Sequence, residues 1–245
     1  MMRVLIYTSI FTLVFGELEA EDWPQWLGTN RDAVWQETGI INTFDESKPK
    51  LIWKSEIGGG YSGPAVSDGQ VFVMDRVGHD TDLKNGSLLH TGDPPANSNF
   101  VKRMLAGFER VLCLEEKTGQ IIWEHKYDCP YRSVASYAIG PRVTPTVDED
   151  RVYTLGAEGD LLCLKVETGN LLWSRKLRIE FDVATPEWGF SAHPLVDKNK
   201  LICMVGGENS TVVAFDKLTG KEIWRSGNAR QPGYCAPVIY MLGGK

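Results

Sequence analysis

The chain has 245 residues, enough for one large domain or two ordinary ones, and its composition of 42% hydrophobic and 24% charged residues is typical of a soluble globular protein. Its formal net charge is -6, and no run of clustered Lys and Arg occurs along the sequence. Nucleic acid and anionic membrane surfaces are therefore not expected as partners.

The first residues have the pattern of a targeting segment. Arg3 provides a positive start, and the apolar run from Val4 to Gly16 is too short to span a bilayer as a helix. We interpret residues 1–20 as a secretory signal peptide, cleaved after Gly16 or Ala20, and an uncleaved membrane anchor is the alternative. This interpretation implies a periplasmic or extracellular protein with no transmembrane span once the signal is removed.

The next segment, residues 21–50, is rich in turn residues and carries three tryptophans without strand or helix periodicity. It is expected to be an N-terminal strap on the surface or rim of the domain. The following run, Leu51–Ile57, has the pattern of the last strand of a repeat, although Lys48 and Pro49 stand where the later repeats have Thr-Gly.

From here on the chain repeats one order of four short apolar runs separated by polar turns, which predicts four-stranded antiparallel sheets. The expected strands are 63–66, 70–74, 110–114 and 120–123 in the first repeat, 142–147, 151–155, 161–165 and 170–174 in the second, and 193–196, 200–204, 211–215 and 222–224 in the third. A long insertion, Asp75–Gly107, interrupts the first repeat, and insertions of that length are usually functional or disordered. Within it, Asp80–Gly86 superficially resembles a calcium loop, but Lys84 at the fifth position and the lack of a Glu at the twelfth favour a polar turn.

One eleven-residue stretch ends every repeat: Cys113–Trp123, Cys163–Trp173 and Ala214–Trp224. Each begins with a small residue, has Thr-Gly at positions six and seven, and ends on Trp, and the three tryptophans stand 50 and then 51 residues apart. Small sheets at this period predict an all-β propeller whose blades surround a channel. The tryptophan of one blade is expected to pack on the Thr-Gly turn of the next, through Thr118, Gly119, Trp123, Thr168, Gly169, Trp173, Ala214, Thr219, Gly220 and Trp224.

With these residues placed, the chain resembles the pyrroloquinoline quinone (PQQ)-like β-propeller repeat family over residues 51–245. The family motif A-x-D-x-x-T-G-x-x-x-W is complete in Ala214–Trp224, and the other two copies keep its Thr, Gly and Trp. Residues 22–40 also resemble the leader of secreted members with unassigned activity. The family usually forms rings of seven or eight blades, whereas three blades and the opening of a fourth at Gly233–Tyr240 stand here. The resemblance thus implies an incomplete ring with exposed edges, which we expect to aggregate or oligomerise.

In a propeller, ligands bind at the channel mouth, where loops enter the innermost strands. These loops carry Tyr61, Tyr137, Arg142, Trp188, His193 and Tyr234. Trp188 and Arg142 are residue types that stack on and pair with an anionic planar quinone, so Tyr61, Arg142, Trp188, His193 and Tyr234 are the candidate cofactor residues. The alternative is that they only pack the loops together. His193 is either a general base or a hydrogen-bonded core residue.

The acidic residues and the cysteines indicate no definite metal site or disulfide. Glu158 and Glu208 follow Gly156 and Gly206 at equivalent turns, which fits either calcium ligands or simple repeat symmetry. Cys113 and Cys163 are expected to be small core residues, and export would permit one disulfide among Cys129, Cys203 and Cys235.

The function class remains divided between two hypotheses. Quinoprotein dehydrogenases carry adjacent cysteines beside the quinone, and this chain has none, so no catalytic residue is predicted. The leading hypothesis is an exported binding or scaffolding module at the cell envelope, which takes a protein partner or a small ligand at the channel mouth. The alternative is a PQQ- and calcium-dependent dehydrogenase of alcohols or sugars.

Overall fold

A computed structural model describes residues 20–40, 43, 49–78, 88–89, 93, 95–97, 101, 103–131 and 139–240. The predicted signal peptide falls outside the described residues except for its last position, and so do the Asp80–Gly86 loop and Tyr137. No helix in the described part is long and apolar enough to cross a membrane.

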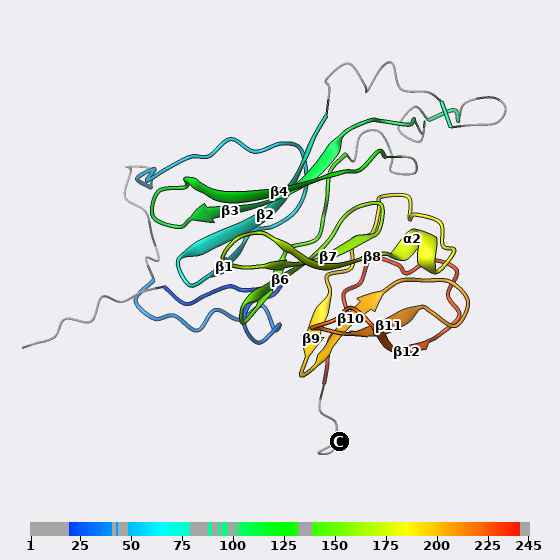
Figure 1. Ribbon diagram of the computed structural model, residues 1–245. Helices are drawn as coiled ribbons and strands as arrows, with labels where there is room; N and C mark the ends of the chain where they lie inside the picture. The colour runs from blue at the N-terminus through cyan, green and yellow to red at the C-terminus, as the bar shows by residue number, and fades with distance from the viewer. Residues whose placement is uncertain are drawn as a thin grey trace, which may run out of the picture.

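The described chain forms three four-stranded antiparallel sheets that follow one another along the sequence (Figure 1). The first contains β1 (Ala65–Ser67), β2 (Gln70–Val77), β3 (Phe108–Glu115) and β4 (Ile121–Asp128). The second contains β5 (Thr146–Asp148), β6 (Arg151–Leu155), β7 (Asp160–Lys165) and β8 (Leu171–Lys176). The third contains β9 (Leu195–Asp197), β10 (Lys200–Met204), β11 (Val212–Asp216) and β12 (Glu222–Ser226). Each sheet is a simple meander, and β5 contacts both β1 and β9, so the first strands of the three sheets stand together.

The last strands β4 and β8 alternate between more and less exposed residues, whereas the central strands of the three sheets contain continuous buried runs. Central strand β7 is buried on both faces. Its Leu161 and Cys163 belong to the hydrophobic cluster shared with the third sheet, and its Leu162 and Leu164 belong to the cluster shared with the first sheet. The main core lies between the second and third sheets and includes Tyr153, Leu161, Cys203 and Phe215. A second cluster joins the first and second sheets, so each sheet shares a hydrophobic layer with the next.

All twelve predicted strands of the three repeats are present in the predicted order, but β1, β5 and β9 begin at Ala65, Thr146 and Leu195 and not at residues 63, 142 and 193. The expected strand Leu51–Ile57 is wrong, since the segment pairs with no strand in the described residues and has no regular structure. Gly233–Tyr240 likewise contains no strand. The insertion begins later than the predicted Asp75, because β2 continues to Val77 and pairs with β3 as far as Phe108. One short helix that the sequence did not predict, α2 (Leu177–Glu180), follows β8.

The Thr-Gly turns have the same geometry in all three sheets. Gly119, Gly169 and Gly220 have φ of 69°, 68° and 69°, a left-handed conformation that glycine adopts without steric cost. In each turn the threonine hydroxyl accepts a hydrogen bond from the amide two residues later, as in Gln120 N to Thr118 Oγ1 at 3.2 Å. The repeated Thr-Gly pair therefore encodes one tight hairpin between the third and fourth strands.

The tryptophan that ends each motif is paired across the strands with the small residue that begins it. Cys113 faces Trp123, Cys163 faces Trp173 and Ala214 faces Trp224, and a β-bulge follows the small residue every time. Because a large indole lies opposite, a small side chain is required at the first position. This pairing is the physical reason for the Cys or Ala that the sequence shows.

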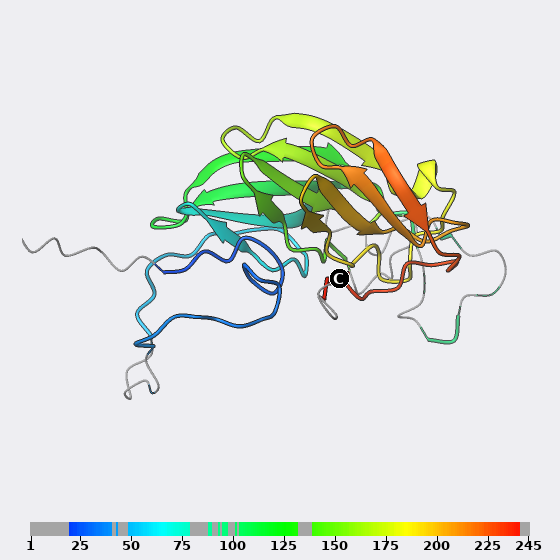
Figure 2. The same cartoon turned by 90° about the horizontal axis from the view of Figure 1, so that it is seen from below.

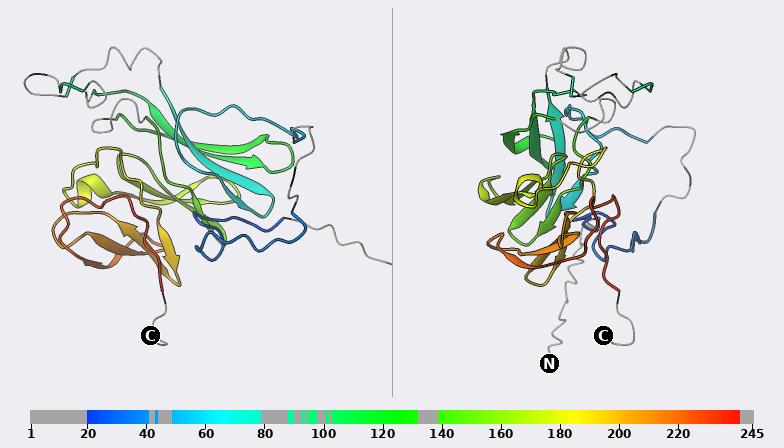
Figure 3. Two further views of the ribbon diagram at one scale, coloured as in Figure 1. Left: turned by 180° about the vertical axis from the view of Figure 1, so that it is seen from behind. Right: turned by 90° about the vertical axis from the view of Figure 1, so that its right-hand side faces the viewer.

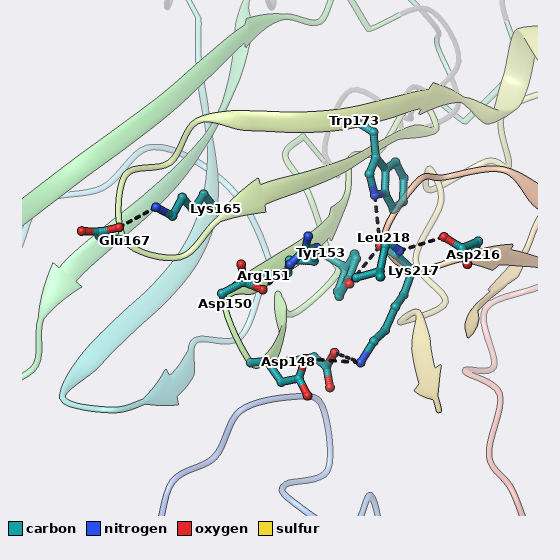
Figure 4. A network of polar contacts seen from close by, with 11 residues as sticks. Asp148, Asp150, Arg151, Tyr153, Lys165, Glu167, Trp173, Asp216, Lys217 and Leu218 are labelled. Atoms are coloured by element: carbon teal, nitrogen blue, oxygen red, sulfur yellow. Dashed lines mark hydrogen bonds and ion pairs between the residues drawn. The ribbon is translucent and has the colours of Figure 1, made fainter. Parts of the chain in front are cut away.

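The indoles of Trp123 and Trp173 each lie on the Thr-Gly turn of the following sheet. A Cβ added at Gly169 would stand 2.5 Å from the Trp123 ring, and one at Gly220 would stand 2.7 Å from the Trp173 ring. Trp123 Nε1 donates to the carbonyl oxygen of Val166 at 2.7 Å, and Trp173 Nε1 donates to that of Lys217 at 3.0 Å (Figure 4). Lys217 Nζ in turn lies 2.6 Å from Asp148 Oδ2, which adds an ion pair between the second and third sheets.

Trp53 makes the same contact although its segment forms no strand. Its indole Nε1 donates to the carbonyl oxygen of Glu116 at 2.7 Å, and its ring covers Gly119. The Thr-Gly turn of the first sheet is thus covered by the segment that precedes β1.

The N-terminal strap and the last described residues lie on one side of the sheets, along the first strands (Figures 2 and 3). Trp23 forms an antiparallel bridge with Val66 of β1, and the carbonyl oxygen of Pro24 accepts a hydrogen bond from Val147 N of β5 at 2.8 Å. The strap therefore follows the inner edges of the sheets instead of the outer surface.

Candidate functional site

Four of the predicted mouth residues form one continuous row, which we call the rim row: Tyr61, Arg142, Trp188 and Tyr234. The Arg142 guanidinium lies 4.3 Å from the centre of the Tyr61 ring, and its Nε donates to the carbonyl oxygen of Trp188 at 3.0 Å. The Trp188 and Tyr234 rings are stacked, with centres 5.6 Å apart. Loops from all three sheets thus place aromatic and cationic side chains in contact.

Backbone contacts hold these loops in place. Tyr61 N donates to the carbonyl oxygen of Pro141 at 2.8 Å, which fixes the loop before β1 beside the loop before β5. Gly140 has φ of 112° and packs against Gly60, a close approach that a side chain would prevent. Trp188 N donates to Tyr234 Oη at 3.3 Å, so the far end of the row is also fixed by a hydrogen bond.

The rim row is open to solvent despite these contacts. The exposed fractions are 56% for Tyr61, 41% for Trp188 and 42% for Tyr234. Protein-binding hot spots are enriched in tryptophan, tyrosine and arginine, because large aromatic side chains lose little conformational entropy on binding.

His193 lies apart from the rim row and against the strap. Its ring stacks on Trp26 with centres 4.8 Å apart and planes at 8°, and its Nδ1 accepts a hydrogen bond from Thr144 N at 3.0 Å. Burial, with the nearby charge of Arg31, lowers the pKa of His193 to about 4. The imidazole is therefore neutral at pH 7, with its free nitrogen lone pair already engaged, which suits a packed residue better than a general base.

The glutamates that were considered as calcium ligands stand in different surroundings. Glu158 is buried and accepts a hydrogen bond from Thr185 Oγ1 at 2.8 Å, while Glu208 is exposed. In the described part of the chain, no group of three or more His, Cys, Asp or Glu side chains is placed to hold a metal ion.

All five cysteines are free thiols, so the structure does not contain the disulfide that export would permit. Cys113, Cys129, Cys163 and Cys203 are buried, and Cys235 is exposed. Burial raises the pKa of Cys113 and Cys163 to about 12, so both remain protonated. These two act as small core residues, as their place in the motif indicates.

Sequence reasoning missed a buried acid between the first and second sheets. Glu109 is fully buried on β3 and accepts hydrogen bonds from the hydroxyls of Tyr127 and Tyr131, both at 2.5 Å, and from Ala157 N at 3.0 Å. Burial raises the pKa of its carboxyl. Tyr127 lies on β4, Tyr131 lies just after it, and Ala157 lies in the turn between β6 and β7, so Glu109 links the first sheet to the second. Because Cys113, Val111 and Glu109 alternate along β3, extending the predicted strand by one residue would have placed Glu109 on this interface.

A small cavity of about 240 Å³ lies between the end of β4 and the residues around α2. Its lining includes Cys129, Glu158, Asp160, Lys176 and Arg178. Burial raises the pKa of Asp160, while Lys176, whose Nζ lies 3.8 Å from its carboxylate, has the opposite effect. The cavity is of mixed charge, and the carboxylates of Glu158 and Asp160 already have cationic or hydrogen-bonding neighbours.

The rim-row residues expected to hold an anionic planar quinone are engaged with one another. One face of the Trp188 ring is stacked on Tyr234, and the Arg142 guanidinium is held between Tyr61 and the Trp188 carbonyl. The strap occupies the inner edges of β1 and β5. The side chains that were expected to stack on a quinone and pair with it therefore contact one another.

Four-stranded meanders in succession, each with its last tryptophan on the Thr-Gly turn of the next, define blades of a PQQ-like repeat β-propeller. The family described as outer membrane protein assembly factor BamB matches residues 107–238, which is more than half of the chain. The chain belongs to this PQQ-like repeat family.

Relatives support the same assignment at low identity. The outer membrane protein assembly factor BamB of Yersinia pestis is 22% identical over 223 residues, which are 84% of this chain and 53% of that protein. The protein of the same name from Shewanella oneidensis is 22% identical over 229 residues, covering 86% of this chain and 54% of its own. The chain thus spans about half the length of these relatives.

Among solved structures, the quinohemoprotein alcohol dehydrogenase from Comamonas testosteroni has a similar fold. The TM-score is 0.52 at 19% identity, and the match covers 83% of this chain and 27% of that one. At this identity the likeness shows the fold alone.

Proposed function

We propose that this protein is exported to the cell envelope and acts there as a scaffold in the assembly of outer-membrane proteins, binding a protein partner through the rim row. The observation that carries the proposal is the rim row itself, in which three exposed aromatic rings and one arginine, from loops of all three sheets, are held in place by mutual contacts. Because the surface is preorganised, binding costs little ordering of side chains. The family and the apolar N-terminal run from Val4 to Gly16 support an envelope location.

We also infer that the tryptophans of the repeat are structural and not part of the binding surface. Trp123 and Trp173 use both the ring and the indole N–H in contacts with the next sheet. Their role is to hold the rim loops of successive sheets in register, so that the row stays continuous.

A complementation experiment in native cells that lack the gene tests the binding role. We expect Trp188→Ala combined with Tyr234→Ala to fail to restore outer-membrane protein levels. Ile179→Ala provides the control, because Ile179 is 62% exposed on α2 and lies outside the rim row, and it should restore them fully. A photo-crosslinking residue at position 234 should capture a protein partner, whereas one at position 179 should not.

Two outcomes would contradict the proposal. If the folded double variant restores the outer-membrane protein levels as well as the unaltered protein, the rim row is not the functional surface. If the full chain instead acquires a bound-quinone spectrum with PQQ and calcium, reduces a dye with alcohols and loses both on Trp188→Ala, the rim row is a cofactor site. The dehydrogenase hypothesis would then replace the scaffold.

A further inference from the structure

The strap residues 23–31 contact equivalent positions in successive repeats. Pro64, Pro145, Pro194 and Pro237 occupy the same place at the start of each inner segment. Two residues after the first of these prolines, Val66 exchanges two backbone hydrogen bonds with Trp23, at 2.9 and 3.0 Å. Two residues after the second, Val147 N donates to the carbonyl oxygen of Pro24. The strap thus binds the first two repeats through main-chain hydrogen bonds.

Arg31 continues the same pattern on the next repeat and on the segment that follows it. Its NH1 donates to the carbonyl oxygen of Pro194 at 2.9 Å, and its Nε donates to that of Pro237 at 3.1 Å. A third bond, from NH2 to the carbonyl oxygen of His193, measures 2.7 Å. Arg31 as a residue is 8% exposed, and burial lowers its pKa to about 10. A buried cation that satisfies three backbone carbonyls is a specific anchor, since a planar fork of donors is needed to reach them.

Trp26 adds the aromatic part of this recognition. Its ring lies flat on His193, and the Arg31 guanidinium stands 5.7 Å from the indole centre. The strap therefore presents a main-chain pair, an aromatic ring and, five residues later, a cation to matching groups on the sheets.

The backbone of the strap is strained in a way that needs this support. Leu27, Arg31 and Ala33 have φ of 67°, 58° and 60°, although none of them is glycine. Such a conformation is unfavourable for a residue with a side chain and persists only where the surroundings hold it. The conformation is therefore imposed by contacts with the sheets.

We propose that the inner edges of the repeats form a binding site for a peptide segment that pairs through its main chain at one end and then turns, and that the strap occupies this site within the same chain. The site takes a segment whose main chain pairs with Val66 and Val147 and that carries an aromatic ring followed five residues later by arginine. Such recognition combines strand addition for affinity with side-chain contacts for specificity. Because a tethered segment is present at an effective concentration in the millimolar range, a free peptide of the same sequence competes poorly with the intact strap.

The test uses the full chain with a weakened strap, Trp26→Ala combined with Arg31→Ala, and Arg230→Ala as control host because Arg230 is an exposed arginine outside the strap. The probe is a fluorescent peptide of residues 21–35. We expect the weakened host to bind this peptide saturably and at least tenfold more tightly than the control host. A probe with Arg31→Ala should bind at least tenfold more weakly than the unaltered probe.

Hydrogen exchange provides a second readout at the Val66 and Val147 amides, which the strap protects. They should exchange faster in the weakened host and recover protection when the peptide is added, while Val111, in the core, stays protected. Unchanged exchange in the weakened host, or faster exchange that the peptide does not reverse, overturns the proposal. If the double variant loses protection throughout the core, the host with Arg31→Lys decides by the same criteria, since lysine keeps the charge but not the planar fork.

Discussion

Individual residues show why the interface between the first two sheets tolerates little change. Glu109 accepts three hydrogen bonds from groups on both sheets, and Gly156 lies directly against its carboxylate. The backbone at Gly156 is not in the left-handed region, so glycine is needed there for space and not for conformation. The sequence predicted a turn at Gly156 but not the acid behind it, because the glutamate belongs to a distant strand.

Replacing Gly156 with alanine should therefore be strongly destabilising. The added Cβ would overlap Glu109 and stand 2.5 Å from Tyr127 Oη, so we expect a loss of about 2 to 4 kcal/mol in the free energy of unfolding. Urea denaturation measures this loss. Gly69→Ala is the control, since nothing lies within 4 Å of its Cβ position and its φ of 71° alone should cost about 1 kcal/mol. Adding Glu109→Ala should make the Gly156 change less costly, and simple additivity would show that the two residues do not clash.

His193 should make the stability of the protein depend on pH. Its pKa is about 4 when folded against 6.5 for a free imidazole, so the unfolded chain binds more protons between these values. The stability that comes from burying His193 in its neutral form is complete above pH 6.5. It is lost as the pH falls toward 4, by at most about 1.4 kcal/mol of unfolding free energy per pH unit. His193→Asn removes the titration, so the advantage of the unaltered protein over this variant should shrink between pH 7 and pH 5 in urea denaturation. A constant difference would mean that the folded imidazole has an ordinary pKa.

At the scale of elements, the Thr-Gly turn and its tryptophan are the part of the fold that the sequence predicts best. The turn needs only local conditions, namely a threonine hydroxyl and a glycine at positive φ, and both are visible in eleven residues. Leu51–Ile57 fails as a strand for the opposite reason, because a strand exists only with a partner. A pattern in one segment cannot supply that partner.

The two ends of the series of tryptophans should respond differently to truncation. Trp123 is 8% exposed and covers Gly169, whereas Trp224 is 39% exposed. Trp123→Ala should cost about 3 to 5 kcal/mol in the free energy of unfolding, and Trp224→Ala less than about 1.5 kcal/mol. Thermal and urea unfolding compare the two variants directly. Equal losses of unfolding free energy in the two variants would contradict the view that these tryptophans stabilise the fold through their contact with the next sheet.

At the scale of the molecule, the repeat period was sufficient to predict the three sheets, their order and the loops at the rim. The contacts of Tyr61, Arg142, Trp188 and Tyr234 could not be predicted, because they join loops from different repeats and depend on how the sheets are placed side by side. His193 was grouped with them for its position before an inner strand. Only the structure shows that Trp26 of the strap covers it.

Association between copies of the chain should depend on Trp53. In the unaltered protein the Gly119 turn is covered by Trp53, so the exposed Trp224 of a second copy has no place on the first sheet. Trp53→Ala uncovers this turn and should produce concentration-dependent association in analytical ultracentrifugation. Adding Trp224→Ala should abolish it. Association of the single variant that persists in the double variant would show that another surface is responsible.

Trp53 covers a Thr-Gly turn that a tryptophan of another copy could otherwise contact, and this affects how copies could associate. A contact between unlike surfaces grows into rings or open filaments whenever both surfaces are available on every copy. Here one of the two is already satisfied within the chain, because every Thr-Gly turn among the described residues has its own tryptophan. An indole placed ahead of the first sheet thus covers the one Thr-Gly turn that no preceding sheet covers among the described residues.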